Sequence, residues 1–235
     1  MIRDIFENHG ITITEEQEQK LNQYYDLLID WNNKINLTSI VEYEEVIWKH
    51  FLDSAFFVSC DKVDLKEKKK VLDLGTGAGF PGMVLAILCP DYEFVLADSL
   101  NKRIEFLKVV INRLQIHNVS VIHGRAEELG RDEKFRNQFD YVVSRAVAEL
   151  PVLLEYCIPF VKKGGYFVSY KSRRLDEEIE NADNALNMLY TKYDKKYKYE
   201  LEYDHSERYL VFFRCENITD SKYPRKPKKI KTNPL

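Results

Sequence analysis

Apolar residues along this chain follow two different periods, and the change between them divides the sequence. Near the start, apolar residues recur at three- and four-residue steps, which predicts an amphipathic helix from about Thr14 to Asn33 and a second helix over about 43–59. Gln17 lies three residues after Thr14, which is the spacing of a capping box at a helix start. We predict that residues 1–65 form a helical cap.

From about residue 70 onward, short apolar runs alternate with helical patterns, as in a parallel sheet covered by helices on both faces. Strands are predicted at 70–74, 93–97, 119–122, 139–143 and 165–170, and helices near 82–89, 101–115, 126–130, 149–162 and 175–189. The turn between two further strands, 197–203 and 208–215, is too short for a crossover, so that pair must be antiparallel. We therefore predict a Rossmann-like, seven-stranded α/β domain over residues 66–217.

Composition narrows the class of protein. The chain has 235 residues with 45% hydrophobic content, enough to fill a sizeable core. Cys60, Cys89, Cys157 and Cys215 are far apart and form no C-x-x-C pair, so neither a zinc site nor a disulfide framework is indicated. No signal-peptide core follows the charged start, and no uncharged run approaches the roughly 18 residues of a membrane span. We expect a cytoplasmic protein that acts as a monomer, without a membrane.

A glycine-rich segment follows the first predicted strand, and it reads Asp73-Leu74-Gly75-Thr76-Gly77-Ala78-Gly79-Phe80-Pro81-Gly82. Glycines let the backbone turn sharply and bring a ligand close to main-chain N–H groups. The spacing also satisfies the pattern of dinucleotide binders, and a tight turn that binds nothing is a third interpretation. Asp73 favours a cationic sulfonium, because a carboxylate at this position would repel a pyrophosphate. The order of acid and glycines resembles motif I of S-adenosylmethionine-dependent methyltransferases.

Two later strand ends carry further candidate ligands of a nucleoside. Asp98 ends the second predicted strand, where a carboxylate can accept hydrogen bonds from both ribose hydroxyls of either cofactor. Ala126 and Glu127 follow the third strand, where methyltransferases typically hold the adenine with a backbone N–H and a neighbouring acid. Glu127 is equally well explained as a first-turn helix residue favoured by the helix dipole.

The methyl acceptor is indicated partly by missing motifs. Ser144-Arg145-Ala146 ends the fourth predicted strand, and the chain contains neither an N-P-P-Y type motif nor a Pro-Cys pair. Methylation of a base amine or of cytosine carbon is therefore disfavoured. Guanine N7 carries an exposed lone pair, so methyl transfer to it needs in-line placement and no general base.

Positive charge is concentrated at the C-terminal end. The net charge is −3, but residues 222–235 carry six cations and no acid, which leaves −9 for the rest. Prolines among these charges predict an extended basic tail over residues 218–235 that tracks phosphates, although a solvated, disordered end is the commoner meaning of such a run. The predicted RNA-binding residues are Lys171, Arg173, Lys222, Arg225, Lys226 and Lys228.

Five stretches together resemble the ribosomal RNA small subunit methyltransferase G family, also called glucose-inhibited division protein B. They are Trp31-Asn32-Asn33-Lys34-Ile35-Asn36-Leu37-Thr38, His50-Phe51-Leu52-Asp53-Ser54, the glycine-rich segment, Ser144-Arg145-Ala146 and Lys222-Tyr223-Pro224-Arg225-Lys226. The resemblance implies a class I methyltransferase sheet and methylation of guanine N7 at position 527 of bacterial 16S rRNA with S-adenosylmethionine. It also implies that 16S rRNA or the small ribosomal subunit is the partner.

The glycine loop and this resemblance together assign roles to individual residues. Cofactor contacts are predicted at Asp73, Gly75, Gly77, Phe80, Asp98, Ala126, Glu127 and Arg145. Arg145 would lie between the cofactor and the target base and is the predicted catalytic residue, since its planar fork suits guanine O6 or a phosphate. His50 and Asp53 are three apart on one helical face, and a packing contact within the cap is favoured over contact with RNA.

Three other functions stay open at this stage. A methyltransferase of a small molecule or protein would leave the basic tail without a role. A nicotinamide-dependent oxidoreductase would use the same glycine loop. An RNA-binding module would keep the loop only as a vestigial pocket.

Overall fold

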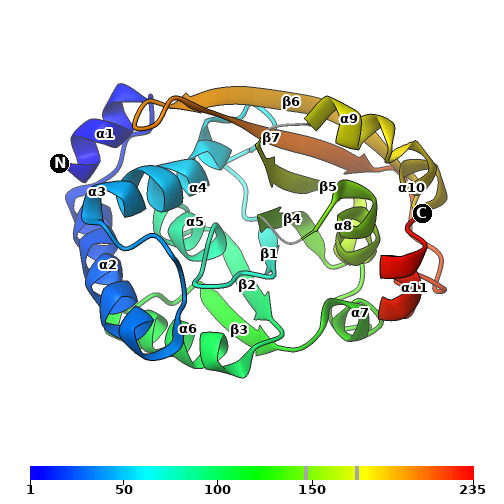
Figure 1. Ribbon diagram of the computed structural model, residues 1–235, viewed down its shortest axis with the longest axis horizontal. Helices are drawn as coiled ribbons and strands as arrows, with labels where there is room; N and C mark the ends of the chain where they lie inside the picture. The colour runs from blue at the N-terminus through cyan, green and yellow to red at the C-terminus, as the bar shows by residue number, and fades with distance from the viewer. Residues whose placement is uncertain (146–147, 173–174) are drawn as a thin grey trace.

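The computed structural model describes residues 1–145, 148–172 and 175–235. Its centre is a seven-stranded sheet in the order β3-β2-β1-β4-β5-β7-β6 (Figure 1). The strands are β1 (Lys70–Leu74), β2 (Glu93–Asp98), β3 (Val119–His123), β4 (Phe139–Arg145), β5 (Val161–Lys171), β6 (Thr191–Leu201) and β7 (Ser206–Cys215). The first five pair in parallel, and β7 runs antiparallel to both β5 and β6, as the sequence predicts. The strand order reverses at β1, the point where ligands bind in such sheets.

Helices cover both faces of this sheet (Figure 1). One face carries the helices that precede β1 or that connect β1, β2 and β3. They are α1 (Ile2–Asn8), α2 (Glu15–Ile35), α3 (Tyr43–Val46), α4 (Asp53–Ala55), α5 (Gly82–Leu88) and α6 (Asn101–Leu114). A π-helical segment, Ile47–Leu52, joins α3 to α4, and a 3-10 turn, Phe56–Ser59, follows. The other face carries α7 (Ala126–Leu129), α8 (Leu150–Cys157), α9 (Leu175–Glu180), α10 (Asp183–Met188) and α11 (Pro227–Thr232), with a 3-10 turn at Ile158–Phe160. In the described residues, no helix is both long and apolar enough to cross a membrane.

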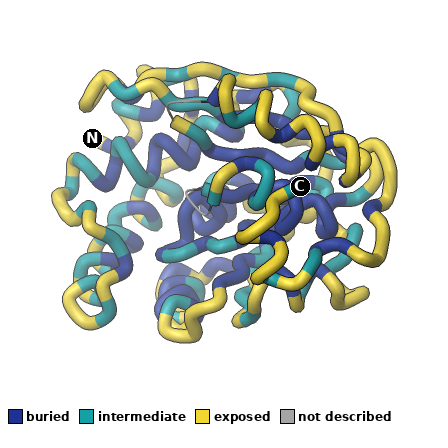
Figure 2. The backbone as a smooth tube through the Cα atoms, turned by 45° about the vertical axis from the view of Figure 1, so that its right-hand side comes forward, coloured by how far each residue is buried: buried dark blue, intermediate teal, exposed yellow. Residues whose placement is uncertain are grey.

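The alternation of side chains along each strand separates two hydrophobic cores. Val71 of β1 joins one core, while its neighbours Leu72 and Leu74 join the other. The first core also contains the buried residues of the predicted cap, so the helices of residues 1–65 pack directly on α5 and α6. Figure 2 shows buried backbone through the centre of the molecule and exposed segments around it.

The capping box predicted at Thr14 is present, and its Gln17 side chain also binds α5. The backbone N–H of Gln17 donates to Thr14 Oγ1 over 3.2 Å, and the backbone N–H of Thr14 donates to Gln17 Oε1 over 2.9 Å. Gln17 Nε2 also donates to the carbonyls of Ile87 and Leu88, at 3.0 and 3.2 Å. One side chain therefore starts α2 and satisfies carbonyls at the end of α5.

Several predicted boundaries were wrong. The strand expected over 197–203 begins earlier, at Thr191, and ends at Leu201. The helix expected over 149–162 stops at Cys157 and β5 begins at Val161, since Pro159 has no N–H to continue an α-helix. β5 runs through Gly164 and Gly165, where its pairing with β4 shifts register, so these glycines mark an irregularity within the strand. The helix expected over 175–189 is two shorter helices.

The extended C-terminal tail was also a wrong prediction. Residues 227–232 form α11, with Pro227 at the first helical position, where its missing N–H carries no penalty. Tyr223 and Ile230 are buried in the second core, and Leu235 packs against it. The segment is thus a docked part of the fold.

Candidate functional site

The glycine loop after β1 is fitted tightly against its neighbours. Gly79 has a φ of +102°, and a Cβ added to it would lie 2.4 Å from the Tyr24 hydroxyl oxygen. A Cβ on Gly82 would lie 2.2 Å from Leu96 Cδ2 and 2.7 Å from Asp73. The Tyr24 hydroxyl, from α2 of the cap, donates to the carbonyl of Ala78 inside the loop. The loop conformation is therefore held from below by the cap and the sheet.

Asp73 holds the loop from inside and does not face the site. Its carboxylate is fully buried, and Oδ2 accepts from Thr76 Oγ1 at 2.6 Å and from the Gly82 N–H at 2.8 Å. Burial raises the pKa of this carboxyl to about 6, against the lowering effect of those two hydrogen bonds. The predicted direct attraction between Asp73 and a cationic ligand is corrected accordingly, because Asp73 acts through the shape of the loop and lines neither cavity described below.

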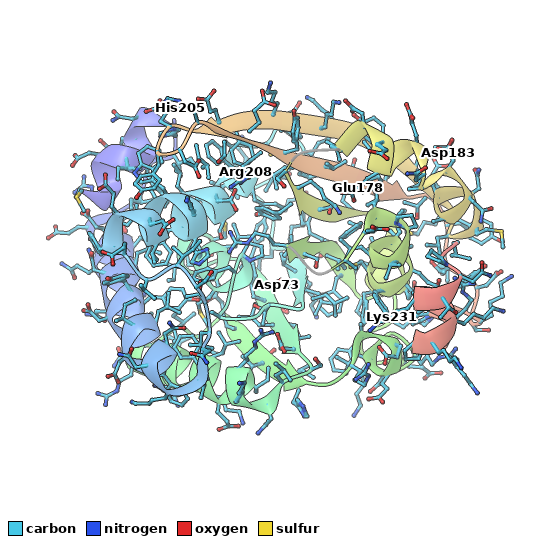
Figure 3. All side chains as sticks on the ribbon, viewed as in Figure 1. Asp73, Glu178, Asp183, His205, Arg208 and Lys231 are labelled. Carbon is cyan, nitrogen blue, oxygen red and sulfur yellow. The ribbon has the colours of Figure 1, made fainter. Side chains whose placement is uncertain are left out.

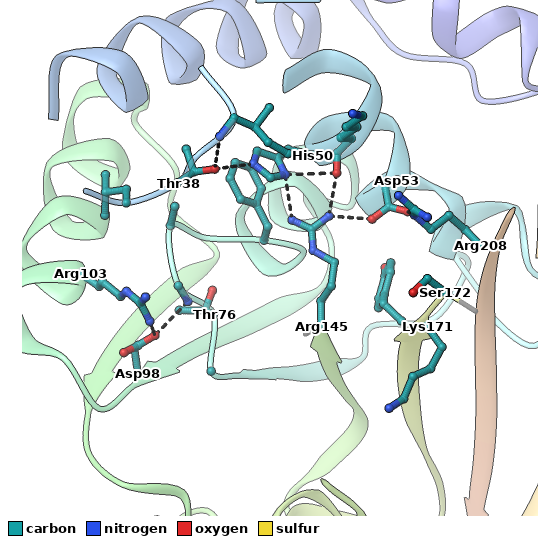
Figure 4. A pocket seen from close by; sticks show the side chains of 18 of the residues that line it. Thr38, His50, Asp53, Thr76, Asp98, Arg103, Arg145, Lys171, Ser172 and Arg208 are labelled. Carbon is teal, nitrogen blue, oxygen red and sulfur yellow. Dashed lines mark hydrogen bonds and ion pairs between the residues drawn. The ribbon is translucent and has the colours of Figure 1, made fainter. Parts of the chain in front are cut away.

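A cavity of about 800 Å³ lies at the carboxyl ends of the central strands (Figure 4). Its floor is the glycine loop, including Gly75, Gly77 and Phe80, and Asp98 closes one side. Asp98 Oδ2 accepts from the Gly77 N–H at 2.9 Å and from Arg103 Nη1 at 3.1 Å, while Oδ1 accepts from the Leu100 N–H at 2.9 Å. Asp98 therefore ties the loop to β2 and still borders the cavity.

Arg145, from the end of β4, reaches across the cavity to the cap. Its Nη1 donates to Asp53 Oδ2 at 2.7 Å and to the carbonyl of Lys49 at 3.1 Å. The guanidinium carbon lies 5.3 Å from the centre of the Phe80 ring, so Arg145 also makes a cation–π contact with a residue of the glycine loop. Both partners are mostly buried, with 15% of the Arg145 side chain and 6% of the Asp53 side chain exposed. Figure 4 shows this contact between the strand end and the helix above it.

His50 contacts Arg145 on the side of the cap, and its ring is neutral. Burial, with Arg145 nearby, lowers the pKa of His50 to about 3. Its Nε2 lies 2.9 Å from Thr38 Oγ1, and its Nδ1 lies 3.3 Å from Arg145 Nη2. A ring protonated on Nε2 donates to Thr38 and accepts from Arg145, whereas a ring protonated on Nδ1 donates to the Lys49 carbonyl at 3.1 Å. The ring stacks on Phe80 with centroids 4.4 Å apart. His50 and Asp53 therefore meet through Arg145, which the prediction of a contact within the cap did not include.

A second cavity, of about 420 Å³, adjoins the first and shares Gly75, Asp98 and Ser99 with it. It is bordered by Ala126 and Glu127 at the start of α7. Glu127 is paired with the guanidinium of Arg125. Its other lining residues include Glu149, Val152 and Tyr156 near and on α8, and Lys231 and Pro234 at the C-terminal end.

The structure thus brings most of the predicted cofactor residues together. Those that line one or both cavities are Gly75, Gly77, Phe80, Asp98, Ala126, Glu127 and Arg145. Asp98 lies where the two cavities meet, so a ligand that spans both would pass it.

Three of the predicted RNA-binding residues form ion pairs with acidic side chains of the protein itself. Lys171 is paired with Glu178 at 2.5 Å with 11% of its side chain exposed, and Lys222 is paired with Asp220 at 3.1 Å. Arg225 is paired with Glu155, which is completely buried, at 2.6 Å. Arg225 is therefore corrected to a structural residue, because its Nε and Nη2 are held by Glu155 and by the carbonyl of Asn233, and 13% of its side chain is exposed. Arg173 lies outside the described residues.

Lys226 and Lys228 fit the RNA-binding prediction better. Both are exposed, and neither has an ion-pair partner within the described parts of the chain.

Some residues of the site were missed by sequence reasoning. Arg103 lines the first cavity and pairs with Asp98, and the cavity is also lined by Thr38 and Lys49 of the cap and by Arg208 of β7. Signals existed for Arg103, which lies in the first turn of the helix that follows Asp98, and for Thr38, which ends one of the five stretches that carry the resemblance. The others come from segments that only the fold brings to the strand ends.

The sequence of this chain is similar to those of one family of known proteins. The model of the family described as rRNA small subunit methyltransferase G matches residues 17–204. The chain is 50% identical to Ribosomal RNA small subunit methyltransferase G of Lachnoclostridium phytofermentans over 216 residues, which cover 92% of this chain and 88% of that protein. It is 46% identical to the protein of the same name from Alkaliphilus metalliredigens over 228 residues, covering 97% and 94%.

Solved structures support the fold. A SAM dependent methyltransferase from Aquifex aeolicus superposes with a TM-score of 0.53 at 18% identity, over 73% of this chain and 93% of that one. The likeness confirms the predicted seven-stranded, Rossmann-like methyltransferase sheet.

Proposed function

The chain belongs to the rRNA small subunit methyltransferase G family, and we propose on that basis that it methylates N7 of the guanine at position 527 of 16S rRNA with S-adenosylmethionine. The observation that carries the proposal is the pair of adjoining cavities at the strand ends, which share Gly75 and Asp98. We propose further that residues 1–65 act as the cap, 66–217 as the methyltransferase domain and 218–235 as a C-terminal segment.

The residues present fit the proposed cofactor. Gly77 borders the first cavity with a φ of +62°, and a Cβ added to it would meet nothing within 4 Å, so the backbone of the loop can approach a ligand closely there. The Asp98 carboxylate has lone pairs beyond those used by Gly77 and Leu100, and the Arg103 contact is the one that a ribose hydroxyl would replace. The second cavity, with Ala126 and Glu127, suits the adenine.

In the proposed reaction, bound S-adenosylmethionine supplies a methyl group on a cationic sulfur, and the N7 lone pair takes the methyl as the C–S electron pair returns to sulfur. Guanine N7 loses no proton, so the site needs no general base. The neutral His50, whose pKa is far below 7, agrees with this, because its ring serves to hold Thr38 and Arg145 in place.

Arg145 is the residue that we propose to contact the target base. Its guanidinium borders the first cavity beside Phe80, and the ion pair with Asp53 fixes the direction of the fork. From this position it would donate to guanine O6 or a neighbouring phosphate and hold N7 in line with the methyl group. A protein that acts on ribosomal RNA is expected in the cytoplasm.

Methyl transfer with labelled S-adenosylmethionine tests the proposal. Free 16S rRNA and small subunits that lack the modification are each incubated with the protein and then cleaved chemically at N7-methylguanine. A single cleavage at guanine 527 is expected. Label in another nucleotide would contradict the assigned position, and cofactor binding without label in any RNA would direct the search to small-molecule or protein acceptors.

A further inference from the structure

The C-terminal segment, residues 218–235, is held in a fixed position by two arginines of the domain. Arg136 donates to the carbonyls of Thr219 and Tyr223, each at 2.7 Å. Arg131 donates to the carbonyl of Pro224, also at 2.7 Å. Such hydrogen bonds to backbone carbonyls fix the path of a segment independently of its own side chains.

A buried ion pair fixes the same segment to α8. The Arg225 N–H and Nε donate to Glu155 Oε1 at 2.7 and 2.8 Å, and Nη2 donates to Oε2 at 2.6 Å. Arg225 Nη2 also donates to the carbonyl of Asn233, which joins the two ends of α11. Pro224 lies against the end of α7, where a Cβ added to Gly130 would be 3.2 Å from its ring. The segment is thereby set against both helices that border the second cavity.

This docking places two residues of the segment at the second cavity. Lys231 and Pro234 line it together with Asp98, Ala126 and Glu127. In Figure 3, Lys231 lies on the side of α11 that faces α7 and α8. The glycine loop forms one end of this cavity through Gly75, and the C-terminal segment forms another part of its wall.

The charges around the cavity leave Lys231 available for a ligand. Among the residues that the structure describes, its ammonium has no hydrogen-bond or ion-pair partner, whereas Glu127 is already paired with Arg125. A lysine ammonium offers three donors and no acceptor. Adenosine offers the complementary groups, since the ring nitrogens of adenine and the ribose oxygens accept hydrogen bonds.

We propose that Lys231 and Pro234 complete the subsite for the adenosyl half of the cofactor. Lys231 donates to an acceptor of the adenosine, and Pro234 covers its edge. The assignment rests on the proposed function, because it requires S-adenosylmethionine to be the ligand of these cavities. It makes the C-terminal segment a part of the cofactor site, in addition to any role of its outer lysines toward RNA.

Calorimetric titration of Lys231→Ala with two probes tests the assignment. The probes are S-adenosylmethionine and 5′-methylthioadenosine, which keeps the adenosyl half but lacks the amino acid. We expect both dissociation constants to rise by the same factor, about three- to tenfold for one lost hydrogen bond. Lys231→Met, which keeps the apolar stem, should bind as weakly as the alanine variant. Lys229→Ala is the matched control, an exposed lysine of the same helix that lines neither cavity, and it should bind as the wild type does.

Each contrary result has a distinct meaning. Unchanged affinity of Lys231→Ala for both probes would overturn the assignment. A loss confined to S-adenosylmethionine would also overturn it, because Lys231 would then not contact the adenosyl half. If the wild-type protein bound neither probe, the proposed cofactor itself would be wrong, which is separate from the role of Lys231.

Discussion

Arg145 at the end of β4 and Asp53 in the cap are 92 residues apart in the sequence, and their side chains form an ion pair of 2.7 Å across the first cavity. Asp53 Oδ1 also accepts from the hydroxyl of Tyr199 at 2.8 Å, so the same carboxylate is tied to β6. The pair therefore joins the cap, the central sheet and the antiparallel edge at the first cavity.

Asp53→Asn should lower turnover and leave cofactor affinity nearly unchanged. The asparagine keeps the shape and an acceptor for Tyr199 but loses the charge that orients Arg145. Misplacing a positioning group by about 1 Å can cost about a hundredfold in rate, so we expect kcat on RNA to fall about ten- to a hundredfold. Single-turnover methyl transfer and calorimetry with S-adenosylmethionine measure the two effects. Asp61→Asn, at an exposed ion pair with Lys195, is the control. An equal loss of cofactor affinity would show that Asp53 supports the cofactor instead.

Tyr24→Phe should weaken cofactor binding through the glycine loop. The variant removes one hydroxyl, which donates to the Ala78 carbonyl, and keeps the ring that packs 5.5 Å from Phe80. We expect about 1 kcal/mol less stability and a several-fold higher dissociation constant for S-adenosylmethionine. Tyr25→Phe is the matched control, since its hydroxyl donates to the Val41 carbonyl away from the loop. The loop would not depend on Tyr24 if both variants bound alike.

His50 and Asp73 should affect the pH dependence of stability in opposite directions. The folded-state pKa of His50 is about 3, below its ordinary 6.5, so its neutral form stabilises the fold above pH 6.5 and this stability is lost as the pH falls from 6.5 toward 3. The folded-state pKa of Asp73 is about 6, above its ordinary 3.8, so protonation favours the fold as the pH falls from 6 toward 3.8.

Single variants separate these two contributions. Between pH 7.5 and 4.5, thermal unfolding of His50→Gln should lose less stability than the wild type, because glutamine does not titrate. Asp73→Asn should lose more stability than the wild type over the same range. Identical pH profiles for all three proteins would contradict both assigned shifts.

The fold was largely predictable because its signals are local. All seven strands were expected, five of them close to their observed bounds, and Asp73 and Asp98 were found because each lies at or next to the end of a short apolar run. The contacts that complete the site are not local. The sequence pattern contains nothing that pairs Arg145 with Asp53, or that brings the hydroxyl of Tyr24 under the glycine loop.

The wrong prediction of an extended C-terminal tail has a different cause. Its lysines and prolines predict an extended, solvated chain, and this composition outweighs three separated apolar residues, Tyr223, Ile230 and Leu235. Those three pack into or against the second core and fix the segment. Because Arg225 is neutralised by Glu155, 70 residues earlier, its charge was counted as available for RNA when it is not.

The remaining outer lysines should still contribute to RNA binding. If Lys226 and Lys228 each neutralise one phosphate of single-stranded RNA, removing both should reduce the slope of log affinity against log salt by about 1.4. Titration of a 16S rRNA fragment between 50 and 200 mM salt measures this slope. Lys66→Ala with Lys68→Ala is the control, because both are exposed just before the amino end of β1, whereas the cavities lie at the carboxyl ends of the strands. The RNA role of the tail would be refuted by an unchanged slope in the first double variant.

Arg225→Ala should destabilise the whole domain, because it leaves the Glu155 carboxylate buried without its partner. Glu155 is completely buried and accepts from the backbone and the guanidinium of Arg225. Removing one member of such a pair costs about 3–5 kcal/mol. Lys222→Ala breaks an exposed pair with Asp220 and should leave the free energy of unfolding unchanged.

Denaturant unfolding of these variants, together with Glu155→Leu/Arg225→Leu, measures the effect and its cause. The double variant should recover part of the loss, since the desolvation penalty of both charges disappears. A loss in Arg225→Ala as small as that in Lys222→Ala would mean that the segment is not held by this pair. The second cavity would then lack the fixed wall that places Lys231 beside Asp98 and Glu127.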